Sequence, residues 1–240
     1  AKDGERPFLA KTPFFTNDAW TSAIADTVKP ADSGKIPEAG ATAGGNGGPT
    51  LPLDGIRVIE FGQFTTAPLC ARHLATLGAE VIKIEPVTGD VARQWNPARD
   101  DIGYYFMYSN ADKHALAVNM RDEEGWNIVR DLIASADVIV QNMKPGSLDR
   151  LGFGWKDVQK FNPSMVCVGI SGFGDDSAYK GRPAVDTIVQ GSSGIMDLTR
   201  DGDVPLSTGI SYSDITGGQL AMLGVVAGLE LRERTGKGMN

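Results

Sequence analysis

Apolar and polar positions alternate along the chain in blocks that predict a regular series of strands and helices. Short apolar runs bounded by turn residues are typical of buried strands, and they lie at 57–61, 80–85, 115–119, 137–141 and 165–170. Helical periodicity fills the intervals at 69–77, 122–134 and 155–161. Strands that alternate with helices predict an α/β fold, here an open, mostly parallel, Rossmann-like sheet with flanking helices. In such a sheet the ligand site lies at the carboxyl ends of the strands.

The stretch 209–238 predicts a further, longer helix. Leu220, Leu223 and Leu231 recur near helical spacing, and most positions beside them are apolar as well. A helix that is apolar nearly all round is a buried helix, so we expect no free face. Gly236 follows two arginines and marks the expected C-terminal end.

Asp214 stands at the start of this helix, among small and polar residues. An aspartate in this place can be an N-cap, which satisfies free backbone N–H groups and has no catalytic role. It can also be a carboxylate nucleophile, because carboxylates form covalent intermediates when a reactive group is held within reach. Spacing alone favours the cap but does not separate the two hypotheses. Gly217 and Gly218 would allow another group to approach the helix closely.

A second carboxylate, Asp186, is followed four residues later by Gln190, so both lie on one face of a predicted helix. Asp186 could act as a general acid or base. It could instead be a first-turn acid that the helix dipole favours, and the residues alone favour this second reading.

Composition narrows the function classes. The 240 residues carry a net charge of -7, which gives no support for nucleic-acid binding as the main role. Cys70 and Cys167 lie in apolar surroundings without metal-ligand spacing, so we expect no metal site and a reducing, cytoplasmic setting. No apolar run reaches membrane-spanning length, so we expect no membrane partner. The turn after the strand at 57–61 lacks the G-x-G-x-x-G fingerprint, which disfavours a nicotinamide enzyme.

Residues 1–52 differ in composition from the rest. Phe8, Phe14 and Trp20 are apolar points in an irregular segment, and 30–52 is rich in Gly, Ala and Pro, as flexible linkers are. We therefore expect an N-terminal extension and linker at 1–52 and a folded domain at 53–240. The extension is either disordered, or an arm or the tail of a preceding domain that docks elsewhere.

The motifs of the folded part resemble, in order, those of a known family. They are Leu53-Asp-Gly-Ile-Arg-Val-Ile-Glu-Phe61, Gly78-Ala-Glu-Val-Ile-Lys-Ile-Glu-Pro86, Asn110-Ala-Asp-Lys-His114, Ala136-Asp-Val-Ile-Val-Gln-Asn-Met-Lys-Pro-Gly146, Leu148-Asp-Arg-Leu-Gly152, Ser171-Gly-Phe-Gly174 and Arg234-Thr-Gly-Lys-Gly238. Each motif alone is weak, but the ordered set over 53–240 is specific. It resembles the class III CoA-transferases, the group of formyl-CoA transferase and carnitine CoA-transferase.

The resemblance implies an activity. Members of this family move CoA from an acyl-CoA donor to a free carboxylic acid through an aspartyl mixed anhydride and an aspartyl-CoA thioester. The aspartate of the family falls on Asp214, which makes the nucleophile the better hypothesis and leaves capping as a second role. CoA is then a substrate, and no permanently bound cofactor is expected.

The resemblance also implies contacts for CoA and for the reacting carbonyl. Lys113, Lys144 and Arg150 would pair with the CoA phosphates, with Asn142 beside them. Their alternative role is that of ordinary surface residues. Thr65 and Thr66 fall in the first strand–helix turn, where the family places a polar residue near the carbonyl; Thr65 stands where a glutamine is often found.

Two other functions stay open. The same superfamily contains α-methylacyl-CoA racemases, which carry a histidine where this chain has Val185, so a second acid or base is lacking. The other is a non-catalytic acyl-CoA-binding module. Family chains are much longer and form interlocked dimers, so we expect a partial chain that lacks the C-terminal half. Its partner would be a second copy of this chain or a second half-chain, and the acyl groups are not specified by the sequence.

Overall fold

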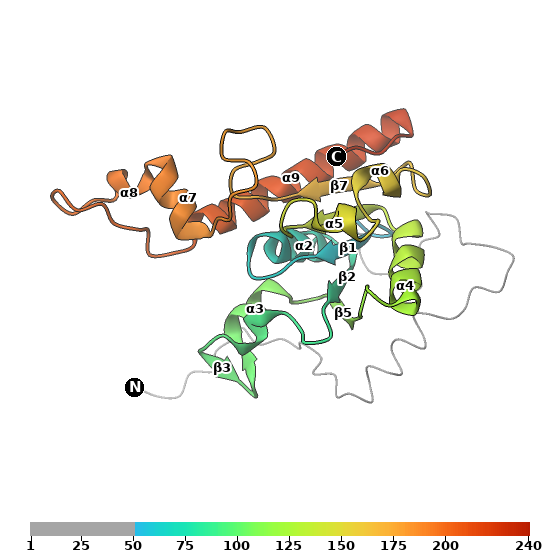
Figure 1. Cartoon of the computed structure of the whole chain (residues 1–240), viewed down its shortest axis with the longest axis horizontal. Helices are drawn as coiled ribbons and strands as arrows, with labels where there is room; N and C mark the ends of the chain where they lie inside the picture. The colour runs from blue at the N-terminus through green and yellow to red at the C-terminus, as the bar shows by residue number, and fades with distance from the viewer. Residues whose placement is uncertain (1–50) are drawn as a thin grey trace, which may run out of the picture. The chain divides into compact units, whose positions relative to one another are not determined.

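A five-stranded parallel sheet forms the centre of the protein (Figure 1). The computed structural model describes residues 51–240, so nearly all of the expected extension at 1–52 lies outside the described residues. The sheet order is β5-β2-β1-β6-β7, and every pairing between neighbours is parallel, which confirms the expected open parallel sheet. Its strands are β1 (Arg57–Phe61), β2 (Glu80–Glu85), β5 (His114–Ala117), β6 (Val138–Gln141) and β7 (Val166–Gly169).

Helices cover both faces of the sheet. Because side chains alternate along a strand, the register places valines of β1, β2 and β6 on one face and isoleucines on the other. Helices α2 (Thr66–Thr76) and α9 (Tyr212–Thr235) cover the valine face, and α4 (Glu123–Ala134) covers the isoleucine face. Burial of these two apolar layers supplies the main stabilisation of the fold.

Shorter elements connect these layers. An antiparallel pair, β3 with β4, stands apart from the main sheet. The remaining elements are η1 (Val91–Gln94), β3 (Ala98–Arg99), β4 (Ile102–Gly103), α3 (Tyr104–Ser109), α5 (Ser147–Arg150), α6 (Trp155–Val158), α7 (Asp186–Ser193) and α8 (Ile195–Leu198). In residues 51–240 no helix combines the length and the apolar character that crossing a membrane would need.

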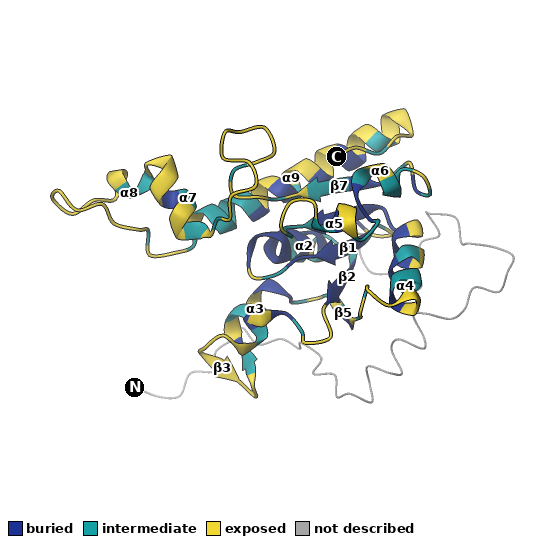
Figure 2. Cartoon of the chain, viewed as in Figure 1, coloured by how far each residue is buried: buried dark blue, intermediate teal, exposed yellow. Residues whose placement is uncertain are grey.

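Helix α9 confirms the long helix predicted from the sequence but not its burial. Ala221, Val225 and Leu229 are buried, whereas Leu220 and Leu223 are 62% and 60% exposed. Figure 2 shows the exposed residues along one side of α9. The prediction of a helix without a free face is therefore wrong for the described part of the chain. The reason is that α9 packs on α2 and β7 along one side, and no described element covers the other.

The contact between α9 and α2 depends on two glycines. A Cβ atom on Gly218 would lie 2.8 Å from the backbone oxygen of Thr66 and 3.1 Å from the Cβ of Leu69, and one on Gly217 would lie 3.1 Å from the Thr66 methyl. These separations are shorter than ordinary contacts, so an alanine at 218 would clash with fixed backbone and one at 217 would displace the Thr66 methyl. The predicted close approach at both glycines is confirmed. It brings Asp214, one turn earlier on α9, against the start of α2.

Candidate functional site

The site lies at the point in the sheet where the strand order reverses. From β1 the chain first moves outward to β2 and β5, then returns to β6 on the other side of β1. The loops after β1 and β6 therefore lie at the carboxyl ends of the strands on the two sides of this reversal, where open α/β sheets bind their ligands. Asn142 joins the two loops, because its Oδ1 accepts from the Gln63 amide at 3.0 Å and its Nδ2 donates to the Gln63 carbonyl at 2.9 Å. This side chain fixes the loop that leads into α2.

A buried ion cluster supports the same loop from beneath. Lys83 Nζ lies 2.9 Å from Glu60 Oε1, 3.0 Å from Asp90 Oδ2 and 2.7 Å from the Gly62 carbonyl oxygen. Burial opposes the charge on Lys83, but the two carboxylates outweigh it and raise the pKa of the ammonium group above its usual value. Because each charge has an opposite partner, the cluster is tolerated in the interior and holds the loop in place.

Lys113 belongs to this interior cluster and not to the surface. Its Nζ lies 2.7 Å from Glu60 Oε2, 2.9 Å from Asn110 Oδ1 and 2.8 Å from the Pro68 carbonyl oxygen, and its side chain is 1% exposed. Burial, with repulsion from Lys83, lowers the pKa of Lys113 to about 8 although Glu60 opposes the shift. The ammonium group thus holds the first turn of α2 and is closed to solvent, and the expected contact with a CoA phosphate stays a prediction.

Asp214 lies in the first turn of α9, and Ser211 occupies the N-cap position. The hypothesis that Asp214 caps this helix is therefore wrong. Its Oδ1 instead accepts a hydrogen bond of 3.1 Å from the Thr66 hydroxyl of α2. Burial and the negative charge of Asp186 raise the pKa of Asp214, while the hydroxyls of Thr66 and Thr65 oppose the rise. The result is a partly desolvated carboxylate held by a neutral donor.

Asp186 supplies the cap that Asp214 does not. It begins α7, and its Oδ1 accepts from the Ser213 amide at 2.8 Å and from the Asp214 amide at 3.4 Å. Gln190, one turn later on α7, donates from Nε2 to the other carboxylate oxygen. The predicted shared helical face of Asp186 and Gln190 is confirmed. Capping of a second helix was not foreseen, because the contact joins residues 27 and 28 positions apart in the chain.

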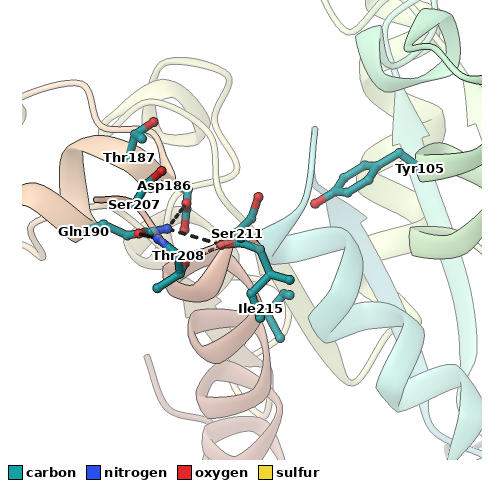
Figure 3. Close-up of a pocket in the computed structure, with 10 residues that line it drawn as sticks. Tyr105, Asp186, Thr187, Gln190, Ser207, Thr208, Ser211 and Ile215 are labelled. Carbon is teal, nitrogen blue, oxygen red and sulfur yellow. Dashed lines mark hydrogen bonds between the residues drawn. The ribbon is translucent and has the colours of Figure 1, made fainter. Parts of the chain in front are cut away.

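A cavity of about 460 Å³ opens beside these groups. Asp186 and Gln190 line it together with the segment 207–211, and Tyr105 of α3 lines it from across the gap (Figure 3). The Tyr105 hydroxyl lies 2.8 Å from Thr65 Oγ1, and burial raises the pKa of the phenol. Thr65 and Thr66 thus connect the cavity wall to Asp214. The aromatic run that contains Tyr105 was the signal in the sequence for this wall, although such runs more often belong to a core.

Aromatic rings extend the wall of the site beyond Tyr105. The ring of Trp95 lies 5.5 Å from that of Tyr105 and 5.2 Å from that of Phe64, measured between centroids. Phe64 has φ of 63°, a strained conformation for a bulky residue, and its side chain is 43% exposed. The chain therefore presents an apolar surface next to the Thr65–Thr66 turn.

The remaining predicted CoA contacts lie after β6. Lys144 and Arg150 are exposed, and Arg150 donates from Nη2 to the Ser147 hydroxyl at 2.9 Å. The structure thus brings Asp214, Thr65 and Thr66 together and leaves Lys144 and Arg150 accessible. It places Asn142 between two loops and Lys113 inside the protein. Contact of any of these residues with CoA stays a prediction.

Known proteins match the same part of the chain that forms this fold. An acetyl-CoA:oxalate CoA-transferase of Acetobacter aceti is 39% identical over 193 residues, which are 79% of this chain and 50% of the relative. A succinyl-CoA:glutarate CoA-transferase of Mus musculus is 38% identical over 192 residues, 78% of this chain and 44% of the relative. The chain spans about half the length of the curated relatives it matches.

Solved structures agree with the sequence relatives. A CAIB/BAIF family protein from Brucella suis has a TM-score of 0.77 and 36% identity, with 80% of this chain and 52% of the other covered. A hypothetical protein from Mycobacterium tuberculosis has a TM-score of 0.73 and 30% identity, with 79% and 52% covered. The family model of CoA-transferase family III matches residues 53–240. The chain thus belongs to CoA-transferase family III.

Proposed function

We propose that this chain carries the nucleophile of a CoA-transferase that moves CoA from an acyl-CoA donor to a carboxylic acid, with Asp214 as that nucleophile. The observation that carries the proposal is the Asp214 carboxylate, hydrogen-bonded by the Thr66 hydroxyl beside a cavity. Relatives named for transfer of CoA to oxalate and to glutarate support the reaction class. They also supply the first acceptors to test.

The proposed chemistry uses one carboxylate twice. An Asp214 oxygen attacks the thioester carbon of the donor, the C–S bond breaks, and CoA leaves as a thiolate while a mixed anhydride forms. The thiolate then attacks the Asp214 carbonyl carbon, which releases the donor acid and leaves an aspartyl-CoA thioester. The acceptor carboxylate attacks that thioester and expels the thiolate. The thiolate finally attacks the acceptor carbonyl of the new anhydride and frees Asp214.

The surroundings of Asp214 support this role. Partial burial removes part of the water that would otherwise stabilise the carboxylate, which increases its reactivity. Thr65 and Thr66 lie where the donor carbonyl would sit, and their hydroxyls are suited to stabilise the developing oxyanion. The aromatic wall of Phe64, Trp95 and Tyr105 is suited to the apolar part of an acyl group.

Binding of CoA would use the loop after β6. Lys144 and Arg150 are exposed cations on this side of the sheet, and we assign them to the CoA phosphates. Lys113 would reach a CoA phosphate only by giving up its three internal contacts.

The whole protein is proposed to act as a homodimer, or with a second half-chain, in the cytoplasm. The exposed leucines of α9, Leu220, Leu223 and Leu231, support a protein contact on that face, because exposed apolar stripes mark interaction surfaces. Two cysteines without a disulfide, Cys70 and Cys167, support a reducing compartment. The division into an extension at 1–52 and a domain at 53–240 is part of the same proposal.

Intact-protein mass spectrometry tests the proposed nucleophile. The 240-residue chain is incubated with acetyl-, formyl- and succinyl-CoA and then treated with hydroxylamine, beside Asp214→Asn and Asp214→Ala. A CoA-sized adduct that hydroxylamine removes, and that neither variant forms, is the expected result. Asn preserves the shape of the side chain, so its failure to react isolates the carboxylate.

Two other outcomes would change the assignment. A folded protein that binds CoA but forms no adduct with any donor would favour the acyl-CoA-binding module. Exchange of the α-proton of a branched acyl-CoA with solvent deuterium, without an adduct, would favour the racemase.

A further inference from the structure

Helix α7 is attached to the protein through a polar side chain. Its buried residue is Gln190, which is 1% exposed, whereas Val185 and Ile188 are 63% and 46% exposed. A buried glutamine costs free energy unless its amide is fully hydrogen-bonded, and an apolar side chain would anchor a helix more simply. The choice of glutamine at this place therefore points to its hydrogen bonds.

These bonds join α7 to the segment that leads into α9. Gln190 Oε1 accepts from the Thr208 amide at 2.9 Å, and Nε2 donates both to the Ile210 carbonyl oxygen at 3.3 Å and to Asp186. Asp186 in turn accepts from the first amides of α9, at Ser213 and Asp214. Figure 3 shows Gln190 and Asp186 directed toward each other at the cavity. One side chain thus orients the carboxylate that caps α9.

We propose that Gln190 is a positioning residue: it fixes the Asp186 carboxylate against the first turn of α9 and thereby sets the placement of the Asp214 side chain. The inference rests on the proposed function for its meaning in catalysis. The effect of Gln190 on the first turn of α9 is a matter of geometry and is measured without any substrate. Gln190 itself is not assigned to contact with a reacting atom.

The variant Gln190→Glu separates hydrogen bonding from packing. It preserves the size of the side chain and the acceptor for the Thr208 amide, but it replaces the donor to Asp186 by a second carboxylate. Protonation of the introduced carboxyl restores that donor, so the effect reverses as the pH falls. Gln190→Met has similar size and no donor at any pH. Gln219→Glu, at an exposed position of α9, is the matched control for added charge.

The ionisable groups around this place are few in the described part of the chain. Asp186 lies on the same helix, Tyr212 and Asp214 on α9 and Tyr105 on α3, while Asp197 of α8 is exposed. The segment 207–210 contributes none. Recovery at acidic pH in Gln190→Glu that is absent in Gln190→Met therefore reports the introduced carboxyl, because the other groups are common to both variants.

Hydrogen exchange of the Ser213 and Asp214 amides, followed by NMR as protection factors, is the test. We expect Gln190→Glu to lower both factors about tenfold or more at neutral pH and to regain them at acidic pH, with no recovery in Gln190→Met. The control should match the wild type. Amides of α2 measured in the same spectra establish that each variant is folded.

Formation of the Asp214 adduct, measured in parallel, links placement to function. We expect adduct formation by Gln190→Glu to slow by about ten- to hundredfold at neutral pH and to recover partly at lower pH. Protonation of a carboxylate nucleophile alone would slow the reaction at lower pH, so this recovery has the opposite direction. Wild-type protection of both amides in both variants would overturn the inference. If the wild type never forms an adduct but the variants show altered protection, the proposed function is overturned and the positioning of Asp214 by Gln190 is retained.

Discussion

Gly218→Ala tests whether the close approach of α9 to α2 places Asp214, the proposed nucleophile. The added Cβ would lie 2.8 Å from the backbone oxygen of Thr66, and that oxygen cannot rotate away. An ordinary contact is roughly 3.4 Å or longer, so α9 must retreat by roughly 0.6 Å at this turn. Asp214 lies one turn earlier on the same face. Its 3.1 Å bond from the Thr66 hydroxyl would then exceed hydrogen-bond length.

The expected change in the free energy of unfolding follows from two opposing effects. Overpacking of this kind costs about 1–3 kcal/mol, whereas replacing glycine by alanine in a helix gains up to about 1 kcal/mol. Gly224→Ala is the matched control, because no atom lies within 4 Å of its added Cβ and only the gain applies. The two variants should therefore differ by about 1–3 kcal/mol in the free energy of unfolding, with Gly218→Ala the less stable.

Urea denaturation measures the stability difference, and the rate of the CoA adduct measures the placement of Asp214. We expect Gly218→Ala to lower the rate by about tenfold or more and Gly224→Ala to leave it unchanged. Equal denaturation midpoints and equal adduct rates in the two variants would refute the argument that this contact positions the nucleophile.

Three further changes test other parts of the structure. Asp214→Asn should be at least as stable as the wild type at pH 7. Folding raises the pKa of the Asp214 carboxyl, so the folded wild type loses stability as the pH rises and this group ionises, whereas the asparagine variant does not. The difference in stability should vanish in denaturation curves at acidic pH. Lys83→Met should cost about 3–5 kcal/mol in urea denaturation, since it leaves Glu60 and Asp90 buried without their shared partner, and a loss below about 1 kcal/mol would contradict this. Leu223→Glu should change stability by no more than about 0.5 kcal/mol and lower the mass in light scattering from that of the proposed dimer to that of a monomer; an unchanged dimer mass would remove α9 from the proposed interface.

Local pattern was sufficient for most of the fold. Strands such as Val138–Gln141 are short apolar runs with turn residues on both sides, and their alternation with helices requires a parallel sheet. Burial of α9 was predicted wrongly, because periodicity reports which residues are apolar and not how many neighbours the chain provides. Leu220 has the same pattern whether a second layer covers it or not.

The site was only partly readable for a related reason. Asp214 was found through its place at the start of an apolar helix and through a family resemblance. Its actual partners, Thr66 and Asp186, come from other elements, and no local spacing relates them. The surroundings of Lys113 were not readable for the same cause, because only the tertiary structure shows that its ammonium group pairs with Glu60 in the interior.

The ion cluster beneath the β1–α2 loop has an evolutionary consequence. Lys83 and Lys113 share Glu60, and Lys83 also pairs with Asp90, so loss of any single charge leaves this buried cluster with an unbalanced net charge. Neutral drift at these four positions is therefore expected to be strongly epistatic. A variant such as Lys83→Met becomes tolerable only when a carboxylate partner is neutralised in the same background, and the order of the two steps matters. Descendants that change here are expected to change in pairs.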